Sequence, residues 1–173
     1  MSNTLAVNKY IELYKDFLHP NPNINSQAFL ILRKEFAVKF MDDLLANLKK
    51  EDLLIRRKSI LALGRFGKKA LKSIVPLYIY TNNKTVKVSC LKTMIKIVVN
   101  LNLEELSQEE MLVVDLALKD NSPEIILTVI SLLRQLGKTG RNILMKTCRD
   151  KNLLIAKASI SALLEMKDQS VDD

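Results

Sequence analysis

Few side chains in this sequence have a type and setting suited to catalysis. His19 is the single histidine and lies in a His-Pro-Asn-Pro turn, where we expect a capping or solvent-facing role rather than general-base work. Cys90 occupies an apolar helix position with no activating histidine and no helix N-terminus beside it. A thiol in that setting has a raised pKa and is a weak nucleophile, so the sequence predicts no thiol chemistry.

The carboxylates and the second cysteine also lack a catalytic or metal-binding arrangement. Glu104 with Glu105 and Glu109 with Glu110 are adjacent pairs, which predicts a solvated helix start rather than an acid/base pair. Cys148 has no Cys or His at ligand spacing, so we expect reduced, structural thiols. No phosphate-binding loop, dinucleotide turn or HExxH motif is present. We therefore predict a non-catalytic protein without cofactor or metal.

Lys and Arg are distributed unevenly along the chain. The net charge is +8, but residues 49–99 carry 13 Lys and Arg against 2 Asp and Glu. Residues 1–48 carry 5 against 5, and residues 100–173 carry 9 against 12. The middle of the chain should therefore attract an anionic surface over about 8 Å, the screening length at physiological salt.

Three interpretations of these charges remain open. In the first, Arg56 pairs with Asp52, and an exposed helix face is solvated by Lys58, Lys87, Lys92 and Lys96. In the second, the charges bind an acidic protein. The third, nucleic acid, is disfavoured because the chain has no Trp and only Tyr78 and Tyr80 lie near the basic segment.

The elements that position these residues follow a repeated apolar pattern. Five short segments begin, at spacings of 31, 31, 39 and 30 residues, with Ile24, Ile55, Val86, Ile125 and Ile155. Small or apolar residues follow four and five positions later: Ala28 and Phe29, Ser59 and Ile60, Cys90 and Leu91, Val129 and Ile130, Ser159 and Ile160. The eighth position holds Leu32, Leu63, Met94, Leu133 and Leu163. A period of about 30 residues predicts stacked helical pairs, because a single pair cannot bury its apolar face.

Helix boundaries follow from turn residues and caps. We expect helices over 4–18, 24–34, 37–48, 54–65, 70–80, 85–100, 107–118, 139–148 and 153–166, with a further one opening at Pro123. Ser107 with Glu110 forms a capping box, and the loop before it accounts for the 39-residue spacing. Gly64 and Gly67 are predicted to make the turn between two helices. Pro76 predicts a late helix start or a kink.

The run from Asp52 to Gly67 (DLLIRRKSILALGRFG) resembles the HEAT-repeat motif. The resemblance implies an all-α fold, a right-handed α-solenoid of about four HEAT-like pairs with capping helices. We expect a single domain over 1–173, with a capping helix over 1–19, repeats over 20–166 and a disordered tail over 167–173. No stretch approaches 18 uncharged apolar residues, so no membrane insertion is expected.

Two shorter segments resemble the small HEAT proteins of cyanobacteria and plastids that are grouped with the E/F-type phycobilin lyases. They are the turn His19-Pro20-Asn21-Pro22 and the run Thr85–Lys92. The resemblance implies attachment of a bilin to, or its removal from, a phycobiliprotein, in the cytoplasm or the plastid stroma. No catalytic residue of that family transfers to a numbered position in this sequence.

The resemblance also implies a binding face, because the second helix of each HEAT pair lines the concave side of the solenoid. It places there Lys39, Lys69, Lys72, Tyr78, Arg141 and Lys146, with Arg65 and Lys68 at the edge. The main hypothesis is a non-catalytic scaffold or assembly factor that binds an acidic protein, for example a phycobiliprotein. The alternatives are one subunit of a heteromeric phycobilin lyase that pairs with a second HEAT subunit, and a nucleic-acid-binding solenoid.

Overall fold

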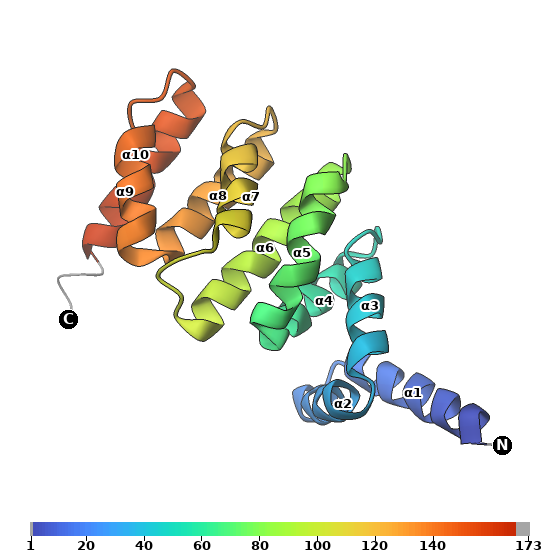
Figure 1. The fold of residues 1–173 in the computed structure, drawn as a ribbon. Helices are drawn as coiled ribbons and strands as arrows, with labels where there is room; N and C mark the ends of the chain where they lie inside the picture. The colour runs from blue at the N-terminus through green and yellow to red at the C-terminus, as the bar shows by residue number, and fades with distance from the viewer. Residues whose placement is uncertain (1, 169–173) are drawn as a thin grey trace. The chain divides into compact units, whose positions relative to one another are not determined.

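The computed structural model of this chain describes residues 2–168, and all regular structure in that range is α-helical (Figure 1). The ten helices within these residues are α1 (Ser2–Leu18), α2 (Pro22–Glu35), α3 (Ala37–Asn47), α4 (Leu53–Phe66), α5 (Lys68–Tyr80), α6 (Lys84–Leu101), α7 (Gln108–Leu118), α8 (Pro123–Gln135), α9 (Gly137–Thr147) and α10 (Leu153–Asp168). The predicted all-α class is confirmed. The tail expected over 167–173 begins inside α10, and its last five residues lie outside the described range.

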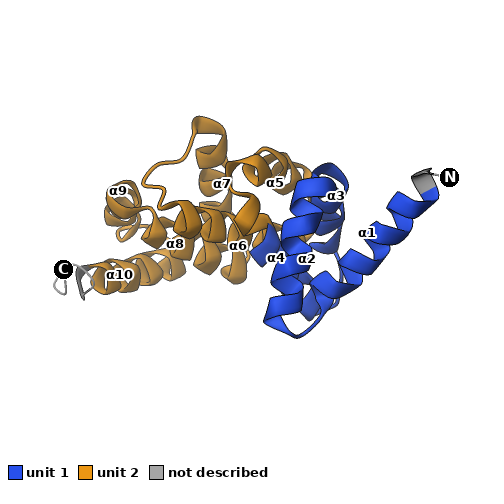
Figure 2. Cartoon of the chain, turned by 90° about the horizontal axis from the view of Figure 1, so that it is seen from below, with its two compact units in different colours: residues 1–62 blue, residues 63–173 orange. Residues whose placement is uncertain are grey.

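The chain divides into two compact units, drawn in different colours in Figure 2. Unit 1 spans residues 1–62 and unit 2 spans residues 63–173, so the division falls within α4. The single domain expected over 1–173 stays a prediction. Among the described residues, no helix is both long enough and apolar enough to cross a lipid bilayer.

The helix starts follow the capping residues in the sequence. Ser107 and Glu110 form the predicted capping box of α7, each side chain bonded to the other residue's backbone N–H. Pro123 is the first residue of α8, as predicted. Helix α2 begins at Pro22, two residues earlier than expected, because the fixed φ of proline suits the first helical position. Capping residues and prolines in the sequence therefore locate the helix ends to within about two residues.

Two glycines make the turns, but Gly64 does not. Gly67 and Gly137 have φ of +64° and +52°, in the region that favours glycine, and each lies at the start of a helix. Gly64 lies inside α4, so its predicted turn role is wrong. A Cβ added to Gly64 would lie 2.7 Å from the Cβ of Lys96, so glycine is required here for the close approach of α4 and α6.

Pro76 lies inside α5, which already begins at Lys68. The expected late helix start is therefore wrong. Proline supplies no N–H to the carbonyl of Lys72 one turn earlier. Both residues are exposed, so water can satisfy that carbonyl.

The core of unit 1 is aromatic. Phe40 is fully buried, and its ring meets those of Phe17 and Phe29 edge-on, at centroid distances of 5.1 and 5.9 Å. The hydroxyl of Tyr10 donates a hydrogen bond to Asp43. The hydroxyl of Tyr14 accepts one from the amide of Asn47, 2.6 Å away. Both tyrosine hydroxyls therefore have side-chain partners.

The core of unit 2 is mainly aliphatic. Within it α8 packs against α6 and α10, and α5 packs against α6 and α7.

The eighth position of the apolar pattern is fully buried at Leu63, Met94 and Leu133. The fourth position is buried throughout the pattern, at Ala28, Ser59, Cys90, Val129 and Ser159. The repeat phase assigned from the sequence is therefore confirmed at these positions, while Ile160 at the last fifth position is 48% exposed.

Candidate functional site

The basic character of the chain comes from an uninterrupted stretch without acidic residues. Between Asp52 and Glu104 the sequence has eleven Lys and Arg and no Asp or Glu. In unit 2 the exposed members of this set are Arg65 at the end of α4, Lys68, Lys69 and Lys72 on α5, and Lys84, Lys92 and Lys96 on α6. Their charge can be balanced locally only by residues outside the stretch.

Several of these cations occupy positions that helix stability does not favour. The first turn of α5 holds Lys68 and Lys69 and no acidic residue, although the N-terminus of a helix carries partial positive charge. Helices α7 and α8 follow the usual preference, with Glu109 and Glu110 in the first turn of α7 and Glu124 in that of α8. Placing like charge at a helix start costs about 0.3 to 1 kcal/mol per residue. The basic start of α5 therefore suggests a role other than stabilising its own helix.

The residues predicted for a binding face divide between the two units. Lys39 lies on α3 in unit 1, while Arg65, Lys68, Lys69, Lys72, Tyr78, Arg141 and Lys146 lie in unit 2. All seven cations are exposed. The ammonium of Lys39 lies 3.1 Å from Asp43 and 4.7 Å from the centre of the Tyr10 ring, so its charge is partly used within unit 1. Tyr78 is only 1% exposed and does not lie on an open face.

Two other cations of the stretch have structural roles in unit 1. Arg56 donates to the backbone carbonyls of Lys50 and Glu51 at 2.6 and 2.8 Å. Asp52 instead caps α4, so the expected pair between Arg56 and Asp52 is wrong. Lys58 donates to the carbonyl of His19, 2.9 Å away, and to that of Leu18 at the end of α1. An ammonium at a helix C-terminus satisfies carbonyls that the helix leaves unpaired.

The residues that could act as nucleophiles or bases are placed as the sequence predicts. The ring Nδ1 of His19 accepts a hydrogen bond from the backbone N–H of Asn21, 3.1 Å away, within an exposed turn. Burial raises the pKa of the Cys90 thiol to about 12, so the thiolate is scarce at neutral pH. In the part of the chain that the structure describes, no three His, Cys, Asp or Glu residues gather in a group that could hold a metal ion.

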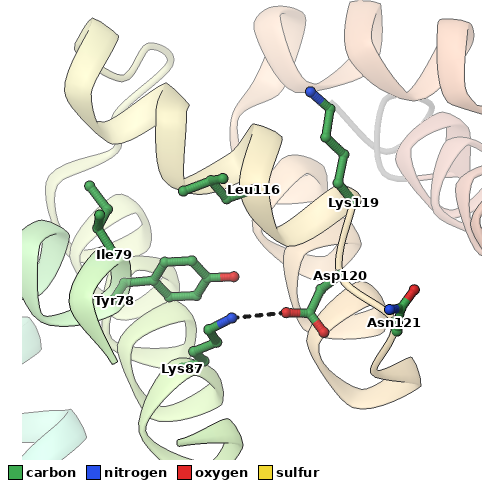
Figure 3. A pocket seen from close by; sticks show the side chains of 7 residues that line it. All are labelled: Tyr78, Ile79, Lys87, Leu116, Lys119, Asp120 and Asn121. Atoms are coloured by element: carbon green, nitrogen blue, oxygen red, sulfur yellow. Dashed lines mark hydrogen bonds and ion pairs between the residues drawn. The ribbon is translucent and has the colours of Figure 1, made fainter. Parts of the chain in front are cut away.

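A pocket of about 360 Å³ lies in unit 2, beside the ends of α5 and α7 (Figure 3). Tyr78 and Ile79 come from the last turn of α5, and Lys87 comes from the first turn of α6. Leu116 comes from the last turn of α7, and Lys119, Asp120 and Asn121 come from the turn that follows it. The pocket therefore gathers residues more than 30 positions apart around two helix-to-helix turns.

The polar wall of this pocket is a Lys–Asp ion pair next to a tyrosine. The ammonium of Lys87 lies 3.1 Å from a carboxylate oxygen of Asp120 and 5.6 Å from the centre of the Tyr78 ring. Asp120 also accepts from the backbone N–H of Ser122, at 2.9 Å. Partial burial opposes ionisation, but the N–H of Ser122 and the charge of Lys87 outweigh it and hold the pKa of Asp120 below its ordinary value. The carboxyl group of Asp120 is therefore ionised at neutral pH.

The hydroxyl of Tyr78 is buried and has no hydrogen-bond partner within the described residues. Burial, and then the negative charge of Asp120, raise the pKa of this hydroxyl well above its ordinary value, so it remains protonated. Figure 3 shows the ring reaching from α5 toward the Asp120 turn. Tyr78 was expected on the exposed binding face, and no pattern in the sequence predicts the pocket. The signal for its burial is the stripe formed by Leu71, Ile74, Val75 and Tyr78 on α5.

Comparison with known proteins gives two related sequences, and no family model matches the chain. The chain is 24% identical over 156 residues to "Uncharacterized phycocyanin operon protein Z" of Pseudanabaena tenuis (strain PCC 7409), a match that covers 90% of this chain and 77% of that protein. It is 28% identical over 135 residues to "Bilin biosynthesis protein CpeZ" of Synechococcus sp. (strain WH8020), covering 75% and 73% respectively. Over most of its length, the chain is therefore related to cyanobacterial proteins named for a phycocyanin operon and for bilin biosynthesis.

Proposed function

We propose that this protein is a helical binding factor in the biosynthesis of bilin-carrying phycobiliproteins, and that it holds a phycobiliprotein subunit through its basic surface. The observation that carries the proposal is the similarity over 156 residues to a phycocyanin operon protein, together with the similarity over 135 residues to a bilin biosynthesis protein. The role fits a cytoplasmic protein of a cyanobacterium, or a stromal protein of a plastid.

The architecture we propose for this role is a right-handed HEAT solenoid. Support comes from unit 2, where α6 and α8, the first helices of two successive predicted pairs, pack against each other, and α10 packs against α8. The buried fourth and eighth positions of the apolar pattern give further support. Stacked repeats offer an extended surface whose exposed residues can vary while the core pattern is kept.

The proposed contact surface is the basic face of α5. Lys68, Lys69 and Lys72 project from one helix whose other side is buried, and no acidic residue lies between Asp52 and Glu104. An acidic partner is favoured because such a surface accelerates association through long-range attraction. Arg65, Arg141 and Lys146 are candidates for further contacts in unit 2, and Lys39 is a candidate in unit 1.

We propose a binding role for this chain rather than bond-making catalysis. The thiol of Cys90 is buried, and the Nδ1 of His19 is occupied as the acceptor of a hydrogen bond within an exposed turn. If the chain takes part in bilin attachment, we propose that it does so as one subunit of a heteromeric lyase and that a second HEAT subunit supplies the reactive groups.

The test measures association of the purified chain with a phycobiliprotein subunit, with and without its bilin, at low and high salt. The variant Lys69→Glu/Lys72→Glu should associate at least about tenfold more slowly at low salt and show a weaker salt dependence. The matched control Lys151→Glu/Lys157→Glu changes the net charge equally on exposed residues outside the proposed surface, and it should retain most of the wild-type rate. Thermal melts should be nearly unchanged for both variants.

Each component of the proposal can fail separately. Failure to bind either form of the subunit would contradict the phycobiliprotein role. Binding that is equally fast in both charge variants would remove the α5 surface from the contact while leaving that role intact. Preferential binding of RNA, measured with the same variants, would favour the nucleic-acid alternative instead.

A further inference from the structure

The buried hydroxyl of Tyr78 has no hydrogen-bond partner among the described residues. The other two tyrosines of the chain with restricted exposure, Tyr10 and Tyr14, both have side-chain hydrogen-bond partners. A buried hydroxyl without a partner costs about 1 to 3 kcal/mol, so such groups are rare in native cores. Because Tyr78 lines a pocket, its missing partner can be supplied by whatever occupies that pocket.

The charges around the pocket decide the kind of partner. Lys87 and Lys119 contribute two positive charges, and Asp120 contributes the single negative one. The carboxylate of Asp120 is already satisfied by Lys87 and by the N–H of Ser122. An ammonium ligand would face two lysines, whereas an anionic oxygen would meet a net positive lining and the hydroxyl donor of Tyr78. The pocket therefore favours an acceptor with negative charge.

The size and the remaining walls restrict the ligand further. A volume of about 360 Å³ is at the lower end of small-molecule pockets, which span roughly 300 to 1,000 Å³. It is larger than a simple inorganic anion requires. Ile79 and Leu116 provide an apolar wall beside the polar one, and Figure 3 shows both near the Tyr78 ring. The arrangement suits a carboxylate attached to a small hydrocarbon body.

We propose that this pocket binds an organic carboxylate, whose oxygens accept hydrogen bonds from the Tyr78 hydroxyl and the Lys87 ammonium while its hydrocarbon part packs between Ile79 and Leu116. Lys119, more exposed at the rim, adds electrostatic attraction. The site stands on its own geometry. Only the choice of a tetrapyrrole as one of the probes rests on the proposed function.

Two pairs of probes distinguish a free small carboxylate from one carried on a larger molecule. The first pair is 3-phenylpropionate and its neutral amide. The second is biliverdin, an open-chain tetrapyrrole with two propionates, and its dimethyl ester. Binding is followed by calorimetry and by chemical-shift changes of the full-length protein. We expect at least one carboxylate to bind and its neutral counterpart to bind at least about tenfold more weakly.

Tyr78→Phe tests the site directly, because it removes one oxygen that has no hydrogen-bond partner among the residues that the structure describes. It should weaken carboxylate binding at least about tenfold. Tyr80→Phe, two residues away and 85% exposed, is the matched control and should bind like the wild type. Lys119→Met is a second variant outside the core, expected to weaken binding a few-fold, and it serves if Tyr78→Phe does not fold.

The outcomes separate this site from the proposed function. The proposal is overturned if no carboxylate binds, or if acid and neutral forms bind equally and neither Tyr78→Phe nor Lys119→Met has an effect. If biliverdin and its ester bind equally and neither variant has an effect, the tetrapyrrole binds outside this pocket, and the proposed role in bilin handling is not contradicted. Binding of 3-phenylpropionate that depends on Tyr78, without association with any phycobiliprotein, would support the site and contradict the proposed function.

Discussion

The cores of the two units use aromatic residues differently. Unit 1 contains six of the nine Phe and Tyr residues of the chain, and its rings at Tyr14, Phe17 and Phe29 surround Phe40. Unit 2 relies on Leu, Ile and Val, and Tyr78 is its only buried tyrosine. In unit 1 the tyrosine hydroxyls are paired with Asp43 and Asn47, whereas the hydroxyl of Tyr78 has no partner among the described residues.

This difference indicates that the unpaired hydroxyl is a local property of the pocket. The chain can pair a tyrosine hydroxyl when it lies inside a core, because it does so twice in unit 1. In unit 2 the carboxylate that lines the same pocket as Tyr78, that of Asp120, is held by Lys87 instead. The two units thus contrast an aromatic core, whose tyrosine hydroxyls are paired, with an aliphatic core beside which the Tyr78 hydroxyl borders a pocket.

The largest expected effect tests the aromatic core of unit 1. Phe40→Ala should lower the free energy of unfolding by about 3 to 5 kcal/mol, because it removes a fully buried ring that meets three others. Leu133→Ala in unit 2 is the matched control, with an expected loss of about 2 to 5 kcal/mol. Urea unfolding followed by near-ultraviolet circular dichroism measures both. A loss below about 1 kcal/mol for Phe40→Ala would contradict the assigned core.

A smaller effect is expected for the paired hydroxyl of unit 1. Tyr10→Phe removes the hydrogen bond to Asp43, a charged acceptor, and should cost about 1.5 to 3 kcal/mol. Lys39 still holds Asp43 at 3.1 Å, so the carboxylate is not left without a partner. Chemical denaturation measures the change, with Tyr80→Phe as an exposed control. Equal stability of Tyr10→Phe and wild type would mean that the hydrogen bond has no net value.

The hydroxyl of Tyr10 should also make the free energy of unfolding depend on pH in the alkaline range. Burial, followed by the hydrogen bond to Asp43, raises the pKa of Tyr10 above its ordinary value of about 10. Because the folded-state pKa is the higher one, this stabilisation is complete below pH 10 and is lost as the pH rises toward the folded pKa. The expected slope is about 1.4 kcal/mol per pH unit for each such tyrosine. Denaturation between pH 9 and 11 should show a smaller slope in Tyr10→Phe, and an unchanged slope would count against the assignment.

The smallest expected change in stability is that of Tyr78→Phe, which should stabilise the protein slightly where Tyr10→Phe destabilises it. Tyr78→Phe removes a buried hydroxyl that has no hydrogen-bond partner in the described part of the chain, so the variant should be as stable as the wild type or more stable by up to about 1 kcal/mol. Thermal and urea unfolding should be compared with those of Tyr10→Phe. A loss as large as that of Tyr10→Phe would show that the Tyr78 hydroxyl has a structural partner after all.

The sequence predicts the all-α class and the helix boundaries well because the signals for helices are local. Apolar spacing and caps such as Ser107 with Glu110 define the helices. The fourth and eighth positions of the repeated apolar pattern identify buried residues such as Cys90 and Leu63. The turn predicted at Gly64 is wrong because the neighbour that requires glycine, Lys96, lies on another helix, and sequence spacing does not show how closely two helices approach. Arg56 was misassigned because backbone carbonyls at a helix junction compete with a carboxylate for its guanidinium.

The candidate sites were less predictable for the same physical reason. The charge imbalance of residues 49–99 is visible in composition, but composition does not show that Lys58 is used internally or that Lys87 pairs with Asp120 33 residues away. The pocket is formed by α5, α6 and the turn after α7, so no single segment carries its pattern. Long-range packing, rather than local propensity, determines it.

The burial of Cys90 makes it possible to measure how often the core of unit 2 opens. Its thiol is 0% exposed, so an alkylating reagent can reach it only during the moments when the surrounding helices separate. With Cys148→Ser removing the other thiol, the alkylation half-life measures how often this core opens, over seconds to days and without denaturant. The same measurement in the presence of a partner or a pocket ligand would show how much longer the bound protein remains closed.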